Sequence, residues 1–264
     1  MATASALLYL VPLLNVAPGT AVAGGYSGGS GGINFGQYGN GPAGGLNIGG
    51  GFGGGGGHGY GTSQYGPTYG DLLAKLEGGS GGSGGSGYYN HGKFATGGGG
   101  GGGGGSIEIN AQGRLTLAGI LNASGGSGGF GLYSGSGGAG GGVLLSGSRV
   151  VLATTGQVNA DGGNSGFTNG PTQSGGAGGG GRITIQTFFL NSFTNNGALN
   201  VNGGQGSLGL NFDQSGNFTP YISNGGNGVI TVIATAVPEP GAGSLLVAIL
   251  GAVPVVAALR KRRK

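Results

Sequence analysis

The sequence predicts an all-β chain: β-solenoid-like (parallel β-helix) repeats with long Gly-rich loops, followed by one C-terminal transmembrane helix. Three observations lead to this prediction: strand-like alternation from residue 106, a unit that recurs along the chain, and an uncharged run near the C-terminus. They divide the chain into a signal peptide-like segment (1–23), a Gly-rich low-complexity region (24–105), a β-repeat region (106–236) and a terminal tail (237–264).

Polar and apolar residues alternate from Ser106 to Asn110 and again from Arg114 to Leu117. This period of two is typical of strands that are buried on one face. A short apolar segment and a pair of glycines follow, and together these parts make one repeat unit.

The unit recurs twice more. Val143 to Gly163 aligns with Ser106 to Gly126 without a gap, and a third copy runs from Arg182 to Gly204 with two extra residues. Val229 to Ile233 resembles the start of a fourth copy.

One unit of this size buries little apolar surface, whereas stacked copies share a continuous core. The repeat therefore favours a solenoid with Gly-rich inserts that loop out from one side. The same strands also fit an antiparallel β-sandwich, which is the alternative. The residues expected to point inward are Ile107, Ile109, Leu115, Leu117 and Leu121 in the first copy, Val143, Leu145, Val151 and Val158 in the second, and Ile183, Ile185, Leu190 and Leu199 in the third.

Residues 24–105 consist mostly of Gly, Ser, Asn and Tyr. Ordering the backbone costs roughly 1–2 kcal/mol per residue, and glycine loses the most freedom. With few apolar side chains to offset this cost, most of the region is expected to stay without order. Within it, Leu72, Leu73 and Leu76 fit one face of a two-turn helix that docks elsewhere.

At the N-terminus, Ala6 to Val16 is apolar, and Ala21-Val22-Ala23 fits a small-residue cleavage site. Met1 to Ser5 contains no Lys or Arg, so the signal is either atypical or begins upstream of this sequence. We expect the chain to be exported.

The charge distribution separates the body from the tail. Charged residues make up 6% of the chain, against roughly 25% in an ordinary soluble domain. Five of the ten basic residues occupy the last five positions, and the remainder has five bases against six acids. The body therefore has no basic patch for nucleic acid. Without cysteine, the chain forms no disulfide and has no thiol chemistry.

The tail has three parts in order: Val237-Pro238-Glu239-Pro240, an uncharged run from Gly241 to Leu259, and the basic cluster Arg260-Lys261-Arg262-Arg263-Lys264. As a helix, the uncharged run extends about 28 Å at ~1.5 Å per residue, close to the ~30 Å hydrocarbon thickness of a bilayer. The basic cluster is expected to stop transfer and to remain on the cytoplasmic side.

This order of motif, span and basic cluster resembles the PEP-CTERM sorting signal of exported bacterial proteins. The resemblance implies recognition near Pro238, Glu239 and Pro240 by an exosortase-type membrane enzyme. It also implies a transient membrane anchor, removal of the tail, and delivery to the cell surface or outside the cell. Such proteins often belong to bacteria that make exopolysaccharide.

The body resembles a Gly-rich repeat region of exported bacterial proteins. The matching stretches include Leu76 to Gly82 and Gly178 to Ile185. This second resemblance implies no defined activity.

Catalytic patterns are missing from the sequence. The two histidines, His58 and His91, lie in Gly-rich stretches, and Glu108 and Asp161 occupy non-equivalent positions of their repeats. A triad hydrolase needs a histidine base, and a glycosidase needs two carboxylates at a fixed separation. We therefore predict no enzyme activity, no catalytic residue, no metal site and no cofactor.

These observations favour an exported cell-surface or extracellular-matrix structural or adhesive protein associated with exopolysaccharide. The alternative is a carbohydrate-active enzyme on a β-solenoid scaffold.

Overall fold

The computed structural model describes residues 24–31, 36–45, 48–53, 56–57, 66–90, 93–167, 174–212 and 218–235. These residues form β-strands, turns and extended segments, with no helix among them. Accordingly, nothing in the described ranges is a helix of a length and apolarity suited to crossing a bilayer. The predicted signal segment and the predicted span from Gly241 to Leu259 both lie outside these ranges.

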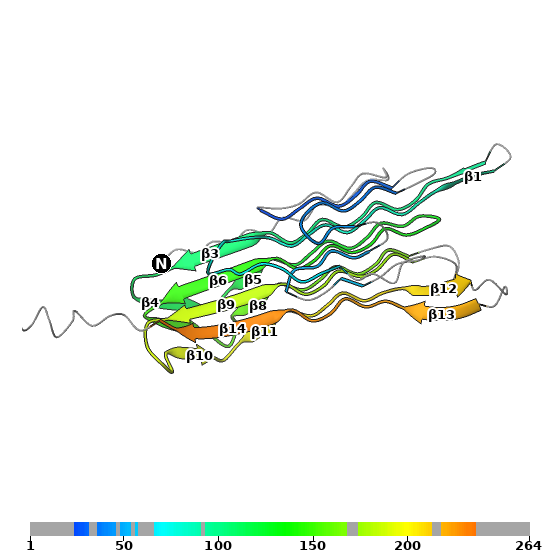
Figure 1. Cartoon of the computed structure of the whole chain (residues 1–264). Helices are drawn as coiled ribbons and strands as arrows, with labels where there is room; N and C mark the ends of the chain where they lie inside the picture. The colour runs from blue at the N-terminus through cyan, green and yellow to red at the C-terminus, as the bar shows by residue number, and fades with distance from the viewer. Residues whose placement is uncertain are drawn as a thin grey trace, which may run out of the picture.

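The strands of the repeats form three parallel sheets at one end of the molecule (Figure 1). The first sheet has the order β14 (Val229–Ala234), β9 (Arg182–Thr187), β6 (Gly142–Gly147), β3 (Ser106–Asn110). The second contains β10 (Phe193–Asn195), β7 (Arg149–Leu152) and β4 (Arg114–Leu117). The third contains β11 (Ala198–Asn200), β8 (Gln157–Asn159) and β5 (Ile120–Asn122).

Two antiparallel hairpins lie at the far end, beyond the glycine-rich segments (Figure 1). They are β1 (Tyr88–Asn90) with β2 (Lys93–Ala95), and β12 (Leu208–Phe212) with β13 (Phe218–Ile222).

The all-β prediction is confirmed for the described residues, and equivalent strands of successive repeats pair in parallel. This pairing is not the antiparallel one that the sandwich alternative requires. The fourth copy is also confirmed at its start, because β14 continues the first sheet beside β9.

The core lies between the three sheets. Most of the predicted inward residues belong to it, and Val143, Leu145, Val158, Ile183 and Ile185 are almost fully buried. The apolar residues of the first copy and Leu199 are partly buried and pack against this cluster. Burial of each such side chain stabilises the fold by about 1.5–3 kcal/mol.

Two of the predicted inward residues do not belong to this cluster. On β7 the cluster contains Val150 and Leu152, so the intervening Val151, although buried at 7% exposure, lies on the opposite face of the strand. Leu190 is 82% exposed, because it lies in the turn that precedes β10 and not in a strand.

The gapless alignment pairs residues that are 37 positions apart, and this offset does not hold along the whole unit. The structure pairs Ile107 with Val143, Leu115 with Val150 and Leu121 with Val158, which are offsets of 36, 35 and 37 residues. The first turn is residues 111–113 in the first copy and a single residue in the second, whereas the second turn grows from 118–119 to 153–156. The offset therefore changes at each turn, and the gapless alignment matches the pairing only at the third strand.

The glycine-rich segments are ordered, contrary to prediction, where the structure describes them. Gly98, Gly101 and Gly104 donate backbone hydrogen bonds of 2.8–2.9 Å to Tyr133, Ser136 and Ala139. Bonds at every third residue match the three residues per turn of polyproline II, whose backbone groups make no bonds within their own helix. The glycine segments therefore form a bundle in which each chain bonds to its neighbours (Figure 1).

The bundle is packed so closely that many of its glycine positions leave no room for a side chain, although small side chains such as Ser83 and Ser136 are buried at other positions. A β-carbon added at Gly101 would overlap the carbonyl oxygen of Gly126, and one at Gly82 would overlap that of Ser136. Gly78–Ser80 and Gly97–Gly104 are buried. Ordering the glycine backbone costs conformational entropy. Backbone hydrogen bonds and close packing between the segments offset this cost, a role that apolar side chains have in an ordinary core.

The segment from Tyr69 to Glu77 docks as expected, but without a helix. It forms a turn at 72–74, in which Leu72 is buried with Phe52 and Ala139, whereas Leu73 and Leu76 are exposed. Only one of the three leucines therefore anchors this segment to the bundle.

Candidate functional site

The residues predicted to direct sorting lie outside the described residues. These are the motif Val237, Pro238, Glu239 and Pro240 and the stop-transfer cluster Arg260, Lys261, Arg262, Arg263 and Lys264. His58 and His91 also lie outside them.

The acidic residues of the described ranges are separated from one another. Among these residues no three His, Asp or Glu side chains gather in a way that suits a metal ion. Asp161 Oδ1 accepts hydrogen bonds from the backbone and side-chain nitrogens of Asn202 at 2.7 and 3.0 Å. Asp71 accepts one from the backbone of Leu73, and Glu77 pairs with Lys75. Each of these three carboxylates has a structural contact.

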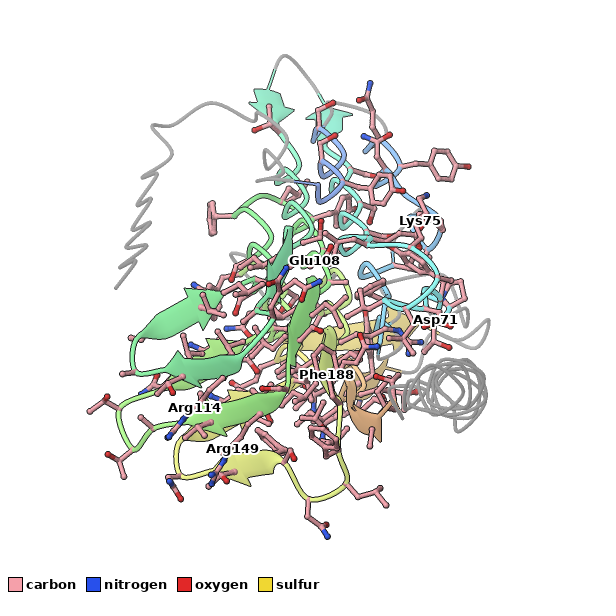
Figure 2. The ribbon with its side chains drawn as sticks, turned by 90° about the vertical axis from the view of Figure 1, so that its left-hand side faces the viewer. Asp71, Lys75, Glu108, Arg114, Arg149 and Phe188 are labelled. Atoms are coloured by element: carbon pink, nitrogen blue, oxygen red, sulfur yellow. The ribbon has the colours of Figure 1, made fainter. Side chains whose placement is uncertain are left out.

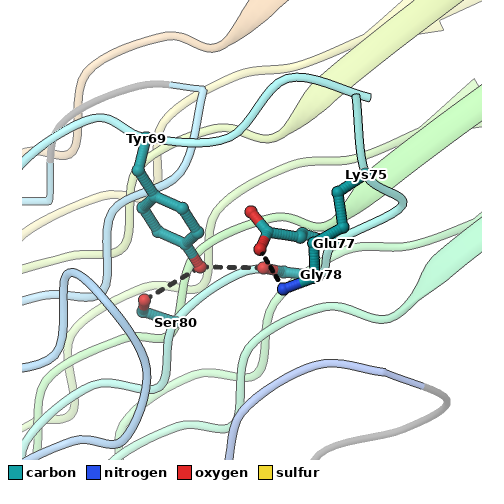
Figure 3. Close-up of polar contacts among 5 residues, drawn as sticks. All are labelled: Tyr69, Lys75, Glu77, Gly78 and Ser80. Atoms are coloured by element: carbon teal, nitrogen blue, oxygen red, sulfur yellow. Dashed lines mark hydrogen bonds and ion pairs between the residues drawn. The ribbon is translucent and has the colours of Figure 1, made fainter. Parts of the chain in front are cut away.

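Tyr69 is a half-buried titratable group near Glu77 (Figure 3). Its hydroxyl donates to the carbonyl oxygen of Gly78 at 2.8 Å and accepts from Ser80 Oγ at 3.0 Å. Burial raises the pKa of Tyr69 well above its usual range, so the hydroxyl stays protonated and remains a donor.

Arg182 joins the same region to the strands. Its Nε donates to the carbonyl oxygen of Tyr69 at 2.9 Å, and its guanidinium lies 5.7 Å from the centre of the Phe52 ring. The Phe52 and Tyr69 rings meet edge to face at 5.0 Å. These contacts hold the 66–77 segment in place, and their geometry suits a structural role.

The most regular exposed surface is built from three glycine-rich rows that continue the third sheet: 123–130, 160–167 and 201–208. Gly125 and Gly128 bond to the carbonyl oxygens of Asp161 and Asn164 in the next row. Gly162 and Ser165 bond in the same way to Asn202 and Gln205. The three rows therefore run side by side in one layer.

Every third residue of a row points to the same side, because polyproline II has three residues per turn. The outer face of the layer consequently carries three ranks of aligned side chains, which we call the ranked face. The first rank is Ser124, Asp161 and Asn202, and the second is Ser127, Asn164 and Gln205. Continuing the period of three gives Phe130, Phe167 and Leu208, the first residue of β12, as the third rank.

The ranked face combines polar and apolar groups in separate lines. All three residues of the second rank are exposed. In the third rank Phe130 is 61%, Phe167 75% and Leu208 50% exposed. Large exposed apolar groups that lie together mark surfaces for interaction.

Side chains of the first two ranks also fix the spacing of the rows. Ser124 Oγ accepts from the backbone nitrogen of Asp161 at 3.3 Å, and Asn164 Oδ1 accepts from that of Gln205 at 2.7 Å. In these bonds, and in the bond from Asn202 to Asp161, a side chain of one row accepts a hydrogen bond from a backbone N–H group of the next row. The ranked face is therefore held rigidly by the chain itself.

Sequence reasoning treated the paired glycines Gly125-Gly126, Gly162-Gly163 and Gly203-Gly204 as the ends of repeats. The signal it missed continues for four more residues: Ser-Gly-Gly-Ser-Gly-Gly-Phe at 124–130, Asp-Gly-Gly-Asn-Ser-Gly-Phe at 161–167 and Asn-Gly-Gly-Gln-Gly-Ser-Leu at 202–208. A period of three with a large apolar residue at the seventh position predicts the ranks.

Comparison with known proteins gives no relative from which a role could be transferred. No family model matches the chain, and no match was found among curated proteins or solved structures.

Proposed function

We propose that this chain is an exported structural or adhesive protein of the cell surface or extracellular matrix, associated with exopolysaccharide. The observation that carries the proposal is the ranked face, where exposed Phe130 and Phe167 stand beside a line of hydroxyl and amide groups. Aromatic rings cover the apolar face of a sugar ring, and neighbouring amides bond to its hydroxyls.

The fold supports a structural role. We infer that the stacked repeats are solenoid coils, in which three short strands alternate with glycine-bundle segments and neighbouring coils share one core. In such an array each coil contacts its neighbours, and the coils build an extended surface. A surface of this kind suits a long polymer better than a small molecule.

The terminal tail supports export. We propose that an exosortase-type enzyme recognises Val237 to Pro240, while Gly241 to Leu259 spans the membrane transiently and Arg260 to Lys264 stop transfer. The family resemblance supplies the enzyme, and the physical pattern of the tail supplies the anchor.

The alternative, a carbohydrate-active enzyme, lacks a supporting observation among the described residues. Asp161 is bonded to Asn202, Glu77 is paired with Lys75, and Asp71 bonds to the backbone of Leu73. We therefore propose a role without turnover.

The proposal is tested in the source cells by fractionation and mass spectrometry. The mature protein should be found in the surface or matrix fraction with a C-terminus at or near Pro240. Changing Phe130 and Phe167 together to serine should release the processed protein into the medium, since the aromatic contact is lost.

Tyr38→Ser is the matched control, because Tyr38 is 65% exposed but lies outside the ranked face. This variant should stay in the matrix fraction. Recovery of intact Arg260 to Lys264 at the surface would contradict the sorting proposal, and unchanged retention of the Phe130/Phe167 variant would contradict the adhesive one.

A further inference from the structure

Two arginines are stacked at one corner of the strand region. Arg114 is the first residue of β4, Arg149 is the first residue of β7, and the two are register partners in the second sheet. Both are exposed. Figure 2 shows them next to each other at the edge of the strands, away from Asp71 and Lys75.

No described acidic residue neutralises this pair. Among the described residues the ion pair is between Lys75 and Glu77, and neither Arg114 nor Arg149 makes a side-chain hydrogen bond with any of them. Like charges directly opposite each other destabilise a sheet. The fold thus carries an unfavourable contact that an external anion would relieve.

The pair also stands out from the other bases. Arg182 is held by the Tyr69 carbonyl oxygen and the Phe52 ring, and Lys75 is paired with Glu77. Arg114 and Arg149 are therefore free to bind a ligand in a body with a net charge near zero.

The surroundings of the pair define what kind of anion fits. The turn of the third coil, residues 188–192, stacks on the same corner, because Val150 donates to the carbonyl oxygen of Ser192 at 3.0 Å. This turn exposes Phe189 at 62% and Leu190 at 82%. The turn that carries these two apolar side chains is thus bonded, at its last residue, to the strand that begins with Arg149.

We propose that this corner, defined by Arg114, Arg149 and Phe189, binds the carboxylates of an acidic polysaccharide such as a polyuronate. The inference rests on the proposed surface function and names the polymer class for it. Guanidinium groups form paired, charge-assisted hydrogen bonds with carboxylates. Parallel strands lie about 4.8 Å apart, so both arginines reach one sugar unit or two adjacent units. Phe189 then covers the apolar face of the ring.

The test measures binding of the purified full-length chain in detergent to polygalacturonate, with dextran and inorganic polyphosphate as comparison polymers. All proteins carry glutamine at positions 260–264, which removes the other basic cluster of the chain. We expect salt-sensitive binding to polygalacturonate, weaker binding to polyphosphate and none to dextran. Arg114→Gln and Arg149→Gln should each weaken the affinity about tenfold, which is the loss of a charged hydrogen bond of ~1.4 kcal/mol.

Lys75→Gln is the matched control, because it removes one exposed positive charge at a distant place and should leave the affinity within about twofold. Thermal unfolding checks the fold, and neither arginine variant should unfold earlier, since a like-charge contact is removed. Equal losses for Lys75→Gln, equal binding to dextran or preference for polyphosphate would each overturn the inference. Retention of the protein at the cell surface is measured separately, and it tests the proposed function but not the binding of polyuronate by this corner.

Discussion

At the scale of single residues, glycine contributes to this fold by its lack of a side chain, which allows neighbouring backbones to approach closely. In the bundle, neighbouring backbones approach so closely that a methyl group has no room, as at Gly101 beside the Gly126 carbonyl. At Gly119, by contrast, an added β-carbon meets nothing within 4 Å. The same residue type therefore has two different roles within 20 positions of the sequence.

This contrast gives a direct test. Gly101→Ala should lower the free energy of unfolding by about 1–3 kcal/mol or more, because the neighbouring chains must move apart. Gly119→Ala should be neutral or stabilising by up to about 1 kcal/mol, since alanine restricts the unfolded chain. Chemical denaturation followed by circular dichroism measures both variants. Equal effects would show that the bundle is not close-packed at Gly101.

At the scale of elements, the period-two pattern predicts which face of a strand is buried but not which residues lie opposite in the next repeat. Val143 and Leu145 are predicted to point inward, and both are buried, but so is Leu144 between them. On β7 three apolar residues also follow one another, so alternation does not say which of them face the core. The turn before β7 is two residues shorter than its counterpart, one residue against 111–113, and only the structure shows this.

The strand assignments predict unequal effects for two leucines of similar sequence context. Leu145→Ala should cost about 2–5 kcal/mol, because Leu145 is 1% exposed at the centre of the core. Leu190→Ala should change stability by less than about 0.5 kcal/mol, since this side chain is 82% exposed. The denaturation midpoints of the two variants check the prediction. A large loss for Leu190→Ala would place it in the core, as the sequence had suggested.

At the scale of the whole molecule, the strands and the glycine bundle form one structure. After its third strand each repeat continues into a ranked row, and a glycine-rich segment, which is buried before β6 and β9, leads back to the first sheet (Figure 1). The glycine-rich segments are thus parts of the repeats and not loops outside them. This arrangement holds exposed aromatic side chains on a rigid support with very little charge.

Hydrogen exchange distinguishes this bundle from a flexible glycine-rich region. Amides of 78–85 and 97–104 should exchange slowly, because they are buried and several donate to neighbouring chains. The exposed turn at 188–192 should exchange faster. Mass spectrometry of peptides after timed deuteration measures both segments, and complete exchange of 78–85 at the earliest time would contradict the bundle.

The ranked face could have been found from the sequence, because its period of three is a local pattern. The pairing of Arg114 with Arg149 could not, because it depends on the length of the turn before β7, and the ungapped alignment places Val151 opposite Arg114. Nor do the glycine runs reveal that they are ordered, since they lack the side-chain pattern on which strand and helix predictions rely.

The sequence by itself determined the all-β class, the recurrence of the strands and most of the inward residues, since alternation and burial are local properties of each strand. It also determined the position of the tail and its charge. Only the tertiary structure decided the register between repeats, the ordered packing of the glycine segments and the pairing of Arg114 with Arg149. The physical reason is that these features depend on which distant segment of the backbone packs beside a given segment. Glycine has no side chain to specify that neighbour, so packing and hydrogen bonds between the segments determine it.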